Sequence, residues 1–337
     1  MRALPAPNIP PLRGGPVLRW GVLAPGEIAN DFVETLHANT DQRAVAVASR
    51  SAERAAAFAA KHGIPKHYAG YEQLVADPEV DVVYVAAPHS EHRTLALLAI
   101  AAGKHVLIEK PIALNATEAR EIAAAARAAG VFAMEAMWTR YLPHTDVIAT
   151  LLADGALGEV KLVTVNLGWR WEYDPTSRGF NPALGGGVML DAGVYSLWLS
   201  HFVLGAPTSV QSAGILAETG VDTQAAVTLD HDGRAQAMVS TTILVNTSGL
   251  ATIHGTDASL AFTRSFVFPS SFTVTAGDER LDWTNEGPEG RAGLAWQAAA
   301  LASYVHEGRT DSPIHSLDDA IEVMQTIDTV RAQLGAI

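Results

Sequence analysis

The 337-residue chain contains no cysteine and no long apolar run, and both absences narrow what it can do. Without cysteine there can be no disulfide, zinc–thiolate site or thiol nucleophile. No apolar run approaches the roughly 18 residues of a membrane span. The first 16 residues carry five prolines and lack a signal-peptide core, so we expect a flexible arm there. These absences are compatible with a cytoplasmic protein, which is our expectation.

Positive charge is also scarce, with 23 basic residues against 36 acidic ones and a net charge of −13. This balance argues against binding to nucleic acid or to anionic membranes, so small molecules are the expected partners. The hydrophobic content of 48% indicates a large core. Because the length exceeds that of a typical single domain, we expect two domains after the arm, over residues 17–141 and 142–337.

Strand and helix patterns alternate through the first of these domains. Such alternation predicts βαβ units, right-handed crossovers and a doubly wound parallel sheet of the Rossmann type. The fold class is therefore α/β, with a dinucleotide-binding domain at the N-terminal side. The predicted strands cover residues 18–24, 44–49, 81–87, 106–108 and 131–135.

The turn after the first strand lies where a dinucleotide fingerprint would occur. Only the central Gly26 of the G-x-G-x-x-G pattern is present, which is a weak match by itself. A side chain at Gly26 would block the approach of the backbone to a pyrophosphate, and the following helix N-terminus offers free N–H groups. We expect Ala24, Gly26, Glu27 and Ile28 to contact the cofactor, although an ordinary βα turn remains the alternative.

The end of the second strand indicates which dinucleotide is bound. Folds that prefer NAD usually place an acidic residue there for the ribose hydroxyl, and folds that prefer NADP place an arginine for the 2′-phosphate. This chain has Ser49 and Arg50, with Arg54 one helical turn later. NADP is therefore the expected cofactor, with NAD possible. The alternative is that Ser51 caps a helix and the arginines are simply solvated.

Two further strand ends carry polar side chains. Glu109 and Lys110 end the strand before Pro111, where doubly wound sheets bind ligands, although a surface charge pair is the alternative. The third strong strand leads into Ala87-Pro88-His89 and His92, for which we expect cofactor or substrate contact. Histidines three residues apart could bind a metal, but no carboxylate or thiol cluster completes a site, so no metal is expected.

The second domain begins with a predicted helix over residues 143–153 and a predicted strand over residues 159–165, and a loop of aromatic and polar groups follows over residues 168–184. Aromatic faces with a few hydrogen-bonding groups suit sugars or cyclic diols, and they suit a subunit contact equally well. We expect Trp169, Arg178 and Phe180 to bind substrate. Beyond residue 207 the chain predicts a run of strands, with a turn at Asp232-Gly233 and a large, mostly antiparallel open sheet in an α+β domain.

Asp191 and Tyr195 lie four residues apart in an apolar segment, so on a helix they share a face. A buried tyrosine or carboxylate needs a partner, and Lys110 is a candidate. A neighbouring ammonium stabilises tyrosinate, which proton exchange with a substrate hydroxyl requires. A capped core helix with an incidental tyrosine is the alternative.

Taken together, these residues resemble the glucose-fructose oxidoreductase and inositol dehydrogenase family (Gfo/Idh/MocA). Residues 134–141 look most like the branch of the dimeric trans-dihydrodiol dehydrogenases, which also act as NADP-linked D-xylose 1-dehydrogenases. Two departures are Ala24 in place of the usual first glycine and Tyr195 where many members carry histidine. The motifs that carry the resemblance are residues 24–29, 87–92, 102–106, 109–111 and 185–195.

The resemblance implies an NADP-dependent oxidoreductase that transfers hydride to or from a carbinol carbon of a sugar or cyclic diol. Tyr195 would be the general acid and base, Lys110 its electrostatic partner and Asp191 an orienting group. Trp138 and Arg140 would contact the cofactor, and Trp138 and Lys110 also the substrate. The family uses the exposed face of the second sheet for oligomerisation, so a homodimer or homotetramer is expected. The alternatives are an enzyme of this fold that retains its cofactor, and a non-catalytic NADP-binding sensor.

Overall fold

The computed structural model describes residues 3–232 and 234–336, and it separates into two compact units. One unit comprises Ile9–Tyr141 with Pro288–Ile321, and the other comprises residues 3–8, Leu142–Gly287 and residues 322–336. The first two residues of the predicted arm, Gly233 of the predicted turn and the last residue lie outside the described residues.

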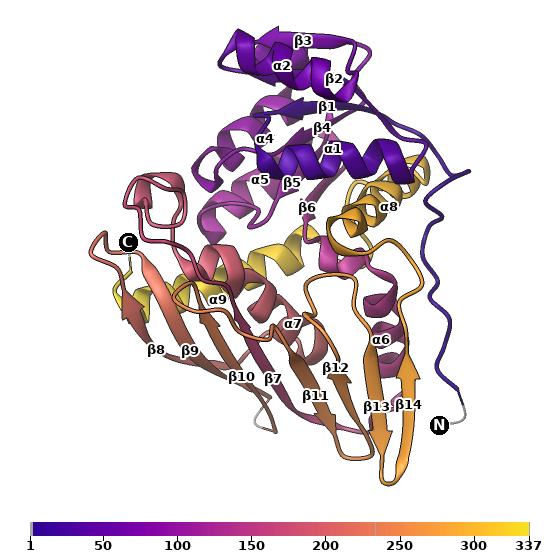
Figure 1. Cartoon of the computed structure of the whole chain (residues 1–337), viewed down its shortest axis with the longest axis vertical. Coiled ribbons are helices and arrows are strands. Elements are labelled where there is room, and N and C mark those ends of the chain that lie inside the picture. The colour runs from indigo at the N-terminus through magenta and orange to yellow at the C-terminus, as the bar shows by residue number, and fades with distance from the viewer. Residues whose placement is uncertain (1–2, 233, 337) are drawn as a thin grey trace. The chain divides into compact units, whose positions relative to one another are not determined.

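The first unit, called here the Rossmann unit, is built on a six-stranded parallel sheet with the order β3-β2-β1-β4-β5-β6 (Figure 1). The predicted doubly wound parallel sheet is therefore confirmed. Its central strands consist of buried apolar residues on both faces, as expected when helices cover both sides of a parallel sheet. The strands are β1 (Arg19–Leu23), β2 (Arg43–Ser49), β3 (Lys66–Ala69), β4 (Val82–Val85), β5 (His105–Glu109) and β6 (Ala133–Ala136).

Helices α2 and α5 of the Rossmann unit each begin at a side-chain cap and end at a left-handed glycine. Ser51 accepts the N–H of Arg54 at the start of α2, so the predicted cap is present, and Gly63 ends α2 in a left-handed conformation. β3 and α3 were not predicted, because elements of four and five residues carry too little periodicity. The helices are α1 (Glu27–Asn39), α2 (Ala52–His62), α3 (Tyr71–Val75), α4 (His92–Ala101), α5 (Ala116–Ala129) and α8 (Ala295–His306).

The second unit, called here the sheet unit, contains eight strands in the order β14-β13-β12-β11-β7-β10-β9-β8. β7 pairs with β10 in parallel and the other described neighbours pair antiparallel, which confirms the mostly antiparallel sheet. β14 was not predicted, because its charged residues alternate with only two apolar ones. The strands are β7 (Val160–Gly168), β8 (Ser209–Leu216), β9 (Asp222–His231), β10 (Ala235–Thr242), β11 (Ala251–Gly255), β12 (Ser259–Phe262), β13 (Phe272–Ala276) and β14 (Glu279–Trp283).

Helices cover one face of this sheet. α6 (Pro143–Ala153) places His144 against Phe262 of β12, and α7 (Val194–Leu204) packs on β7 and β10. The part of α9 (Leu317–Leu334) that belongs to the sheet unit contacts β8, because Gln333 donates to the carbonyl of Val210 at 2.8 Å.

One helical stretch, Pro182–Leu204, is long and apolar enough to cross a membrane by length and composition. Its apolar window is 78% buried inside the protein, as is common for a core helix, so the stretch is weak evidence for a span.

Candidate functional site

The carboxyl ends of β1 and β4 mark the point where the connections of the parallel sheet change direction. From β1 the chain moves to β2 and β3 on one side, and β4, β5 and β6 follow on the other. Ligands of open α/β sheets bind at such a switch point. Because strands of a parallel sheet end at the same edge, the segments after β1, β2, β4, β5 and β6 all lie at this edge.

The turn after β1 has the geometry of a phosphate cradle. Ala24 adopts a left-handed conformation with φ of 62°, at the position where the family pattern has glycine. Gly26 precedes the first turn of α1, and a Cβ added there would approach no protein atom closer than the Ala24 carbonyl oxygen at 4.0 Å. The space beside Gly26 is therefore open to a ligand, and the free N–H groups of α1 follow directly.

The residues after β2 lie beside this turn. Arg54 donates to the carbonyl oxygen of Pro25 at 3.3 Å, which ties the first turn of α2 to the turn after β1. Arg50 is exposed and lies near Tyr71 of α3, where its charge opposes the rise that burial causes in the pKa of Tyr71. Ser49 is buried and accepts the N–H of Ser51 at 3.2 Å. Two guanidinium groups therefore lie at the sheet edge, and no acidic residue ends β2.

The segments after β4 and β5 are joined by His92. This histidine is fully buried, and its two ring nitrogens lie 2.8 Å from the Pro111 carbonyl and 2.9 Å from the Ala87 carbonyl. Burial lowers the pKa of His92, while the two carbonyls oppose that shift. His89 packs against it edge-on. The structure thus gives the His92 ring main-chain partners, and its predicted cofactor contact stays a prediction.

Glu109 is buried beside Lys110 at the end of β5. One carboxylate oxygen accepts the Tyr84 hydroxyl at 2.5 Å and the other accepts the N–H of Lys110 at 3.2 Å. Burial raises the pKa of Glu109, and the Tyr84 hydroxyl, Lys110 and Arg291 oppose that rise. Glu109 is thus turned inward onto Tyr84, while Lys110 is partly exposed at the sheet edge.

Arg291 was missed by the sequence analysis. It precedes α8, and its guanidinium lies 5.9 Å from the centre of the Trp138 ring and 3.6 Å from the Asp31 carboxylate of α1. Arg140 donates from Nε to the carbonyl of Ile314 at 2.9 Å and is almost fully buried. No local motif marks Arg291, because more than 150 residues separate it from Trp138 in the sequence.

The predicted substrate residues lie in the sheet unit. The Arg178 guanidinium pairs with the Asp191 carboxylate at 3.1 Å and stacks over the Trp171 ring at 4.7 Å. A Cβ on Gly179 would lie 2.0 Å from that ring, so only glycine permits this stack. Asp191 and Tyr195 are both buried, with 5% and 3% exposure. Trp171 belongs to the aromatic loop but was not predicted to bind substrate. In the structure it packs with Arg178, which was.

Two more loop aromatics were predicted to bind substrate. Phe180 is buried and packs edge-on against Tyr173, which is half exposed. Trp169 is partly exposed, and its main-chain N–H donates to the carbonyl of Thr242 at 3.2 Å. Lys110 and Trp138, which were also predicted to bind substrate, lie in the Rossmann unit.

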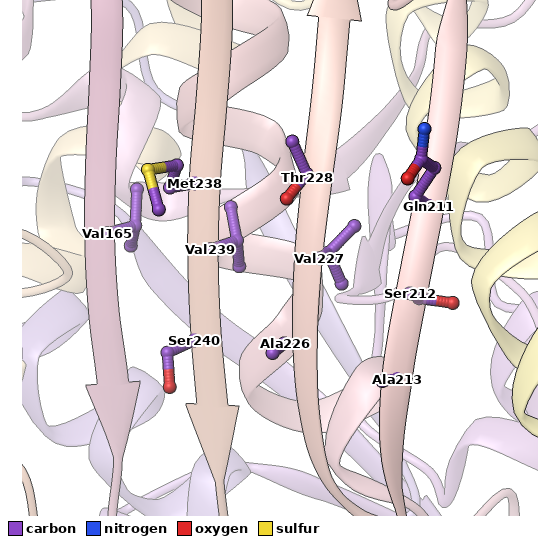
Figure 2. A pocket seen from close by; sticks show the side chains of 10 residues that line it. All are labelled: Val165, Gln211, Ser212, Ala213, Ala226, Val227, Thr228, Met238, Val239 and Ser240. Carbon is purple, nitrogen blue, oxygen red and sulfur yellow. The ribbon is translucent and has the colours of Figure 1, made fainter.

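The outward face of the large sheet has a shallow pocket over β7 to β10 (Figure 2). It is lined by small or uncharged side chains, and Met238 is the largest of them, with 54% exposure. Its lining residues are Val165, Gln211, Ser212, Ala213, Ala226, Val227, Thr228, Met238, Val239 and Ser240.

Residues 18–137 match the model of an oxidoreductase family with an NAD-binding Rossmann fold, GFO_IDH_MocA, and residues 146–261 match the C-terminal domain of the same family. The chain belongs to this family. It is therefore an oxidoreductase of the dehydrogenase or reductase type, with a Rossmann domain for a nicotinamide dinucleotide.

Similar proteins cover nearly the whole chain. A trans-1,2-dihydrobenzene-1,2-diol dehydrogenase from Xenopus tropicalis is 36% identical, over 94% of this chain and 98% of its own length. A 3-ketoreductase from Actinomadura kijaniata solved with NADP and TDP-benzene has a TM-score of 0.81 and 24% identity, covering 96% of this chain and 98% of that one. A levoglucosan dehydrogenase solved with NADH and levoglucosan has a TM-score of 0.85 and 19% identity, covering 94% and 97%.

The left-handed conformation of Ala24 leads to a stability prediction. A glycine at this position adopts φ of 62° without the steric cost of a Cβ. Ala24→Gly should therefore raise the free energy of unfolding by about 0.5 to 1 kcal/mol, measured by urea denaturation, although alanine-to-glycine changes normally destabilise. Ala57→Gly, on the exposed side of α2, is the control and should lower it by about 0.5 to 1 kcal/mol. Losses in both variants would contradict the strain assigned to Ala24.

Proposed function

We propose that this protein is an NADP-dependent dehydrogenase that oxidises a carbinol carbon of a cyclic diol or a sugar such as an aldose. The observation that carries the proposal is the similarity to trans-dihydrodiol dehydrogenases along 94% of the chain, with both Lys110 and Tyr195 present. A non-catalytic sensor would need neither side chain. Activity is tested by screening trans-dihydrodiols, aldoses and inositols with NADP and with NAD, following absorbance of the reduced nicotinamide.

The residues of the sheet edge fit a nicotinamide dinucleotide. The open space beside Gly26 and the N-terminus of α1 would hold the pyrophosphate. Arg50 and Arg54 offer guanidinium groups for a 2′-phosphate, and β2 ends in Ser49 rather than in an acidic residue. When bound, the nicotinamide supplies the hydride acceptor for alcohol oxidation.

In this proposal Tyr195 accepts the proton of the substrate hydroxyl as the carbon loses hydride. Lys110 stabilises the tyrosinate electrostatically and orients the substrate oxygen. Asp191 is tied to Arg178 at 3.1 Å, so it orients polar groups of the substrate and need not itself exchange a proton. The Trp171 and Phe180 rings offer apolar faces that suit a cyclic diol or a sugar ring.

The first functional prediction concerns cofactor preference. A charge-assisted contact from Arg50 to a 2′-phosphate is worth about 1.5 to 3 kcal/mol, so Arg50→Ala should weaken NADP binding by roughly ten- to hundredfold and leave NAD binding nearly unchanged. Dissociation constants from quenching of protein fluorescence measure this. Arg127→Ala removes the same charge near the C-terminal end of α5 and serves as the control. Equal losses for both cofactors would rule out the assignment.

The second prediction concerns the chemistry. Tyr195→Phe removes the transferable proton and Lys110→Ala removes the cation, so each should lower kcat by about 10² to 10⁴-fold, with a smaller change in cofactor affinity. The double variant should be little worse than the poorer single one. In the unmodified protein, kcat for alcohol oxidation should rise with pH through one ionisation that Tyr195→Phe abolishes. Near-normal kcat with the same pH profile in Tyr195→Phe would place the acid–base group elsewhere, and His89 would be examined next.

We also propose that the outward face of the large sheet binds a second copy of the chain. The residues that line its pocket over β7 to β10 are uncharged and mostly small, and Met238 has half of its surface exposed. Monomeric proteins rarely expose such a face, and a flat surface of small side chains can meet its own copy across a twofold axis.

Light scattering at micromolar concentration should therefore give a multiple of the 35.6 kDa chain mass, most simply twice that value. Met238→Glu would place like charges near each other across a twofold contact and should shift the protein to a monomer. Val17→Glu, at an equally exposed apolar residue of the Rossmann unit, should leave the mass unchanged. A monomeric mass for the unmodified protein would refute the proposal.

A further inference from the structure

The helix that carries Tyr195 is capped by a carboxylate from a distant strand. Asp222, the first residue of β9, is fully buried, and its Oδ2 accepts the N–H of Met189 at 2.6 Å. Val188 itself cannot supply a side-chain cap, so Asp222 provides the acceptor that a serine or aspartate usually provides locally.

The charge of Asp222 suits this position. The N-terminus of a helix carries positive potential, which favours an anion there. On its other side, the carboxylate lies 3.8 Å from the Arg331 guanidinium of α9, which is also largely buried. Burial raises the pKa of Asp222, and the N–H groups and Arg331 oppose that rise.

The two glycines before the helix allow close contacts, and one of them makes room for this carboxylate. Gly187 has φ of +116°, and a Cβ there would lie 2.5 Å from Asp222 Oδ1. A Cβ on Gly186 would lie 2.9 Å from the carbonyl oxygen of Asn181. The sequence analysis used these glycines only as part of the family motif. In the structure the missing side chain of Gly187 leaves space for the Asp222 carboxylate beside the first residue of the helix.

A π-helical turn, Met189–Gly193, separates the cap from α7. Such turns are rare and are held in place by their surroundings, and they occur often at functional sites. Asp191 lies within this turn, and Tyr195 is the second residue of α7. The point at which the helix begins therefore sets the positions of both side chains.

We infer that Asp222 is a positioning residue for the reaction: it fixes the first turn of this helix, and thereby Asp191 and Tyr195. The inference rests on the proposed function, because fixing this turn affects the reaction only if Tyr195 exchanges the proton. Asp222 does not itself need to touch substrate or cofactor.

The test compares Asp222→Ala and Asp222→Asn with Asp230→Ala, a change on the same strand at an aspartate that is only partly buried and accepts a bond from Gln236. In Asp222→Ala, amide hydrogen exchange of residues 188–196 should accelerate at least about tenfold, because the first turn loses its acceptor. A displacement of about 1 Å at a reacting group costs roughly a hundredfold in rate, so kcat per cofactor-binding site should fall on that scale. KM for NADP should change by less than about threefold, since the Rossmann unit is untouched.

Asp222→Asn retains one acceptor oxygen and should recover most of kcat and of the protection from exchange, while Asp230→Ala should match the unmodified protein. If Asp222→Ala does not fold, Asp222→Asn alone decides, because it should still show a smaller loss of kcat together with faster exchange at residues 188–196. A kcat that stays normal in a folded Asp222→Ala, while Tyr195→Phe is inactive, would overturn the inference and leave the proposed function intact. If Asp222→Ala does not fold, a normal kcat together with unchanged exchange at residues 188–196 in Asp222→Asn would overturn it in the same way. Normal kcat in Tyr195→Phe would instead overturn the proposed function.

Discussion

Buried carboxylates that accept main-chain N–H groups fix the chain at both segments that carry the proposed catalytic residues. In the Rossmann unit, Glu135 accepts the N–H of Ile112 at 2.9 Å, two residues after Lys110, and pairs with His315 at 2.7 Å. In the sheet unit, Asp222 accepts the N–H of Met189. A buried carboxylate left without donors costs several kcal/mol, so neither segment can shift without that penalty. Each unit thus fixes its own half of the proposed chemistry.

The Rossmann unit adds a second support at the same edge. His92 lies between the carbonyls that follow β4 and β5, and Glu109 binds the main chain of Lys110. A neutral imidazole has one N–H for two carbonyls, so the carbonyls favour the doubly protonated ring and burial opposes it. The segments after β4 and β5 are therefore tied to each other by hydrogen bonds at the edge where dinucleotides bind in open α/β sheets.

The sequence predicted the features that are determined by residues close together in the chain, and it missed those that depend on distant partners. The predicted bounds of α6, from Pro143 to Ala153, agree with the structure because the helical pattern and its N-terminal proline are local features. The strand ends that carry Gly26, Arg50 and Lys110 were likewise placed by alternation of strands and helices. Asp222 and Arg291 were missed because their partners lie far away in the sequence, and no spacing rule links them. The turn at Met189–Gly193 was expected as regular helix, because no residue type marks a π-helical turn.

The cofactor edge and the loop of residues 168–184 differ in how many contacts hold them, and this difference explains how one fold can serve several substrates. The cofactor edge depends on main-chain contacts from many strands, so changes there disturb the sheet. The loop of residues 168–184 depends on fewer contacts, chiefly the Trp171–Arg178–Asp191 stack and its glycine, and most of its residues are exposed. Similar proteins are named for a dihydrodiol, for levoglucosan and for a ketoreduction. A loop that is held by few contacts can change its side chains without disturbing the strand ends.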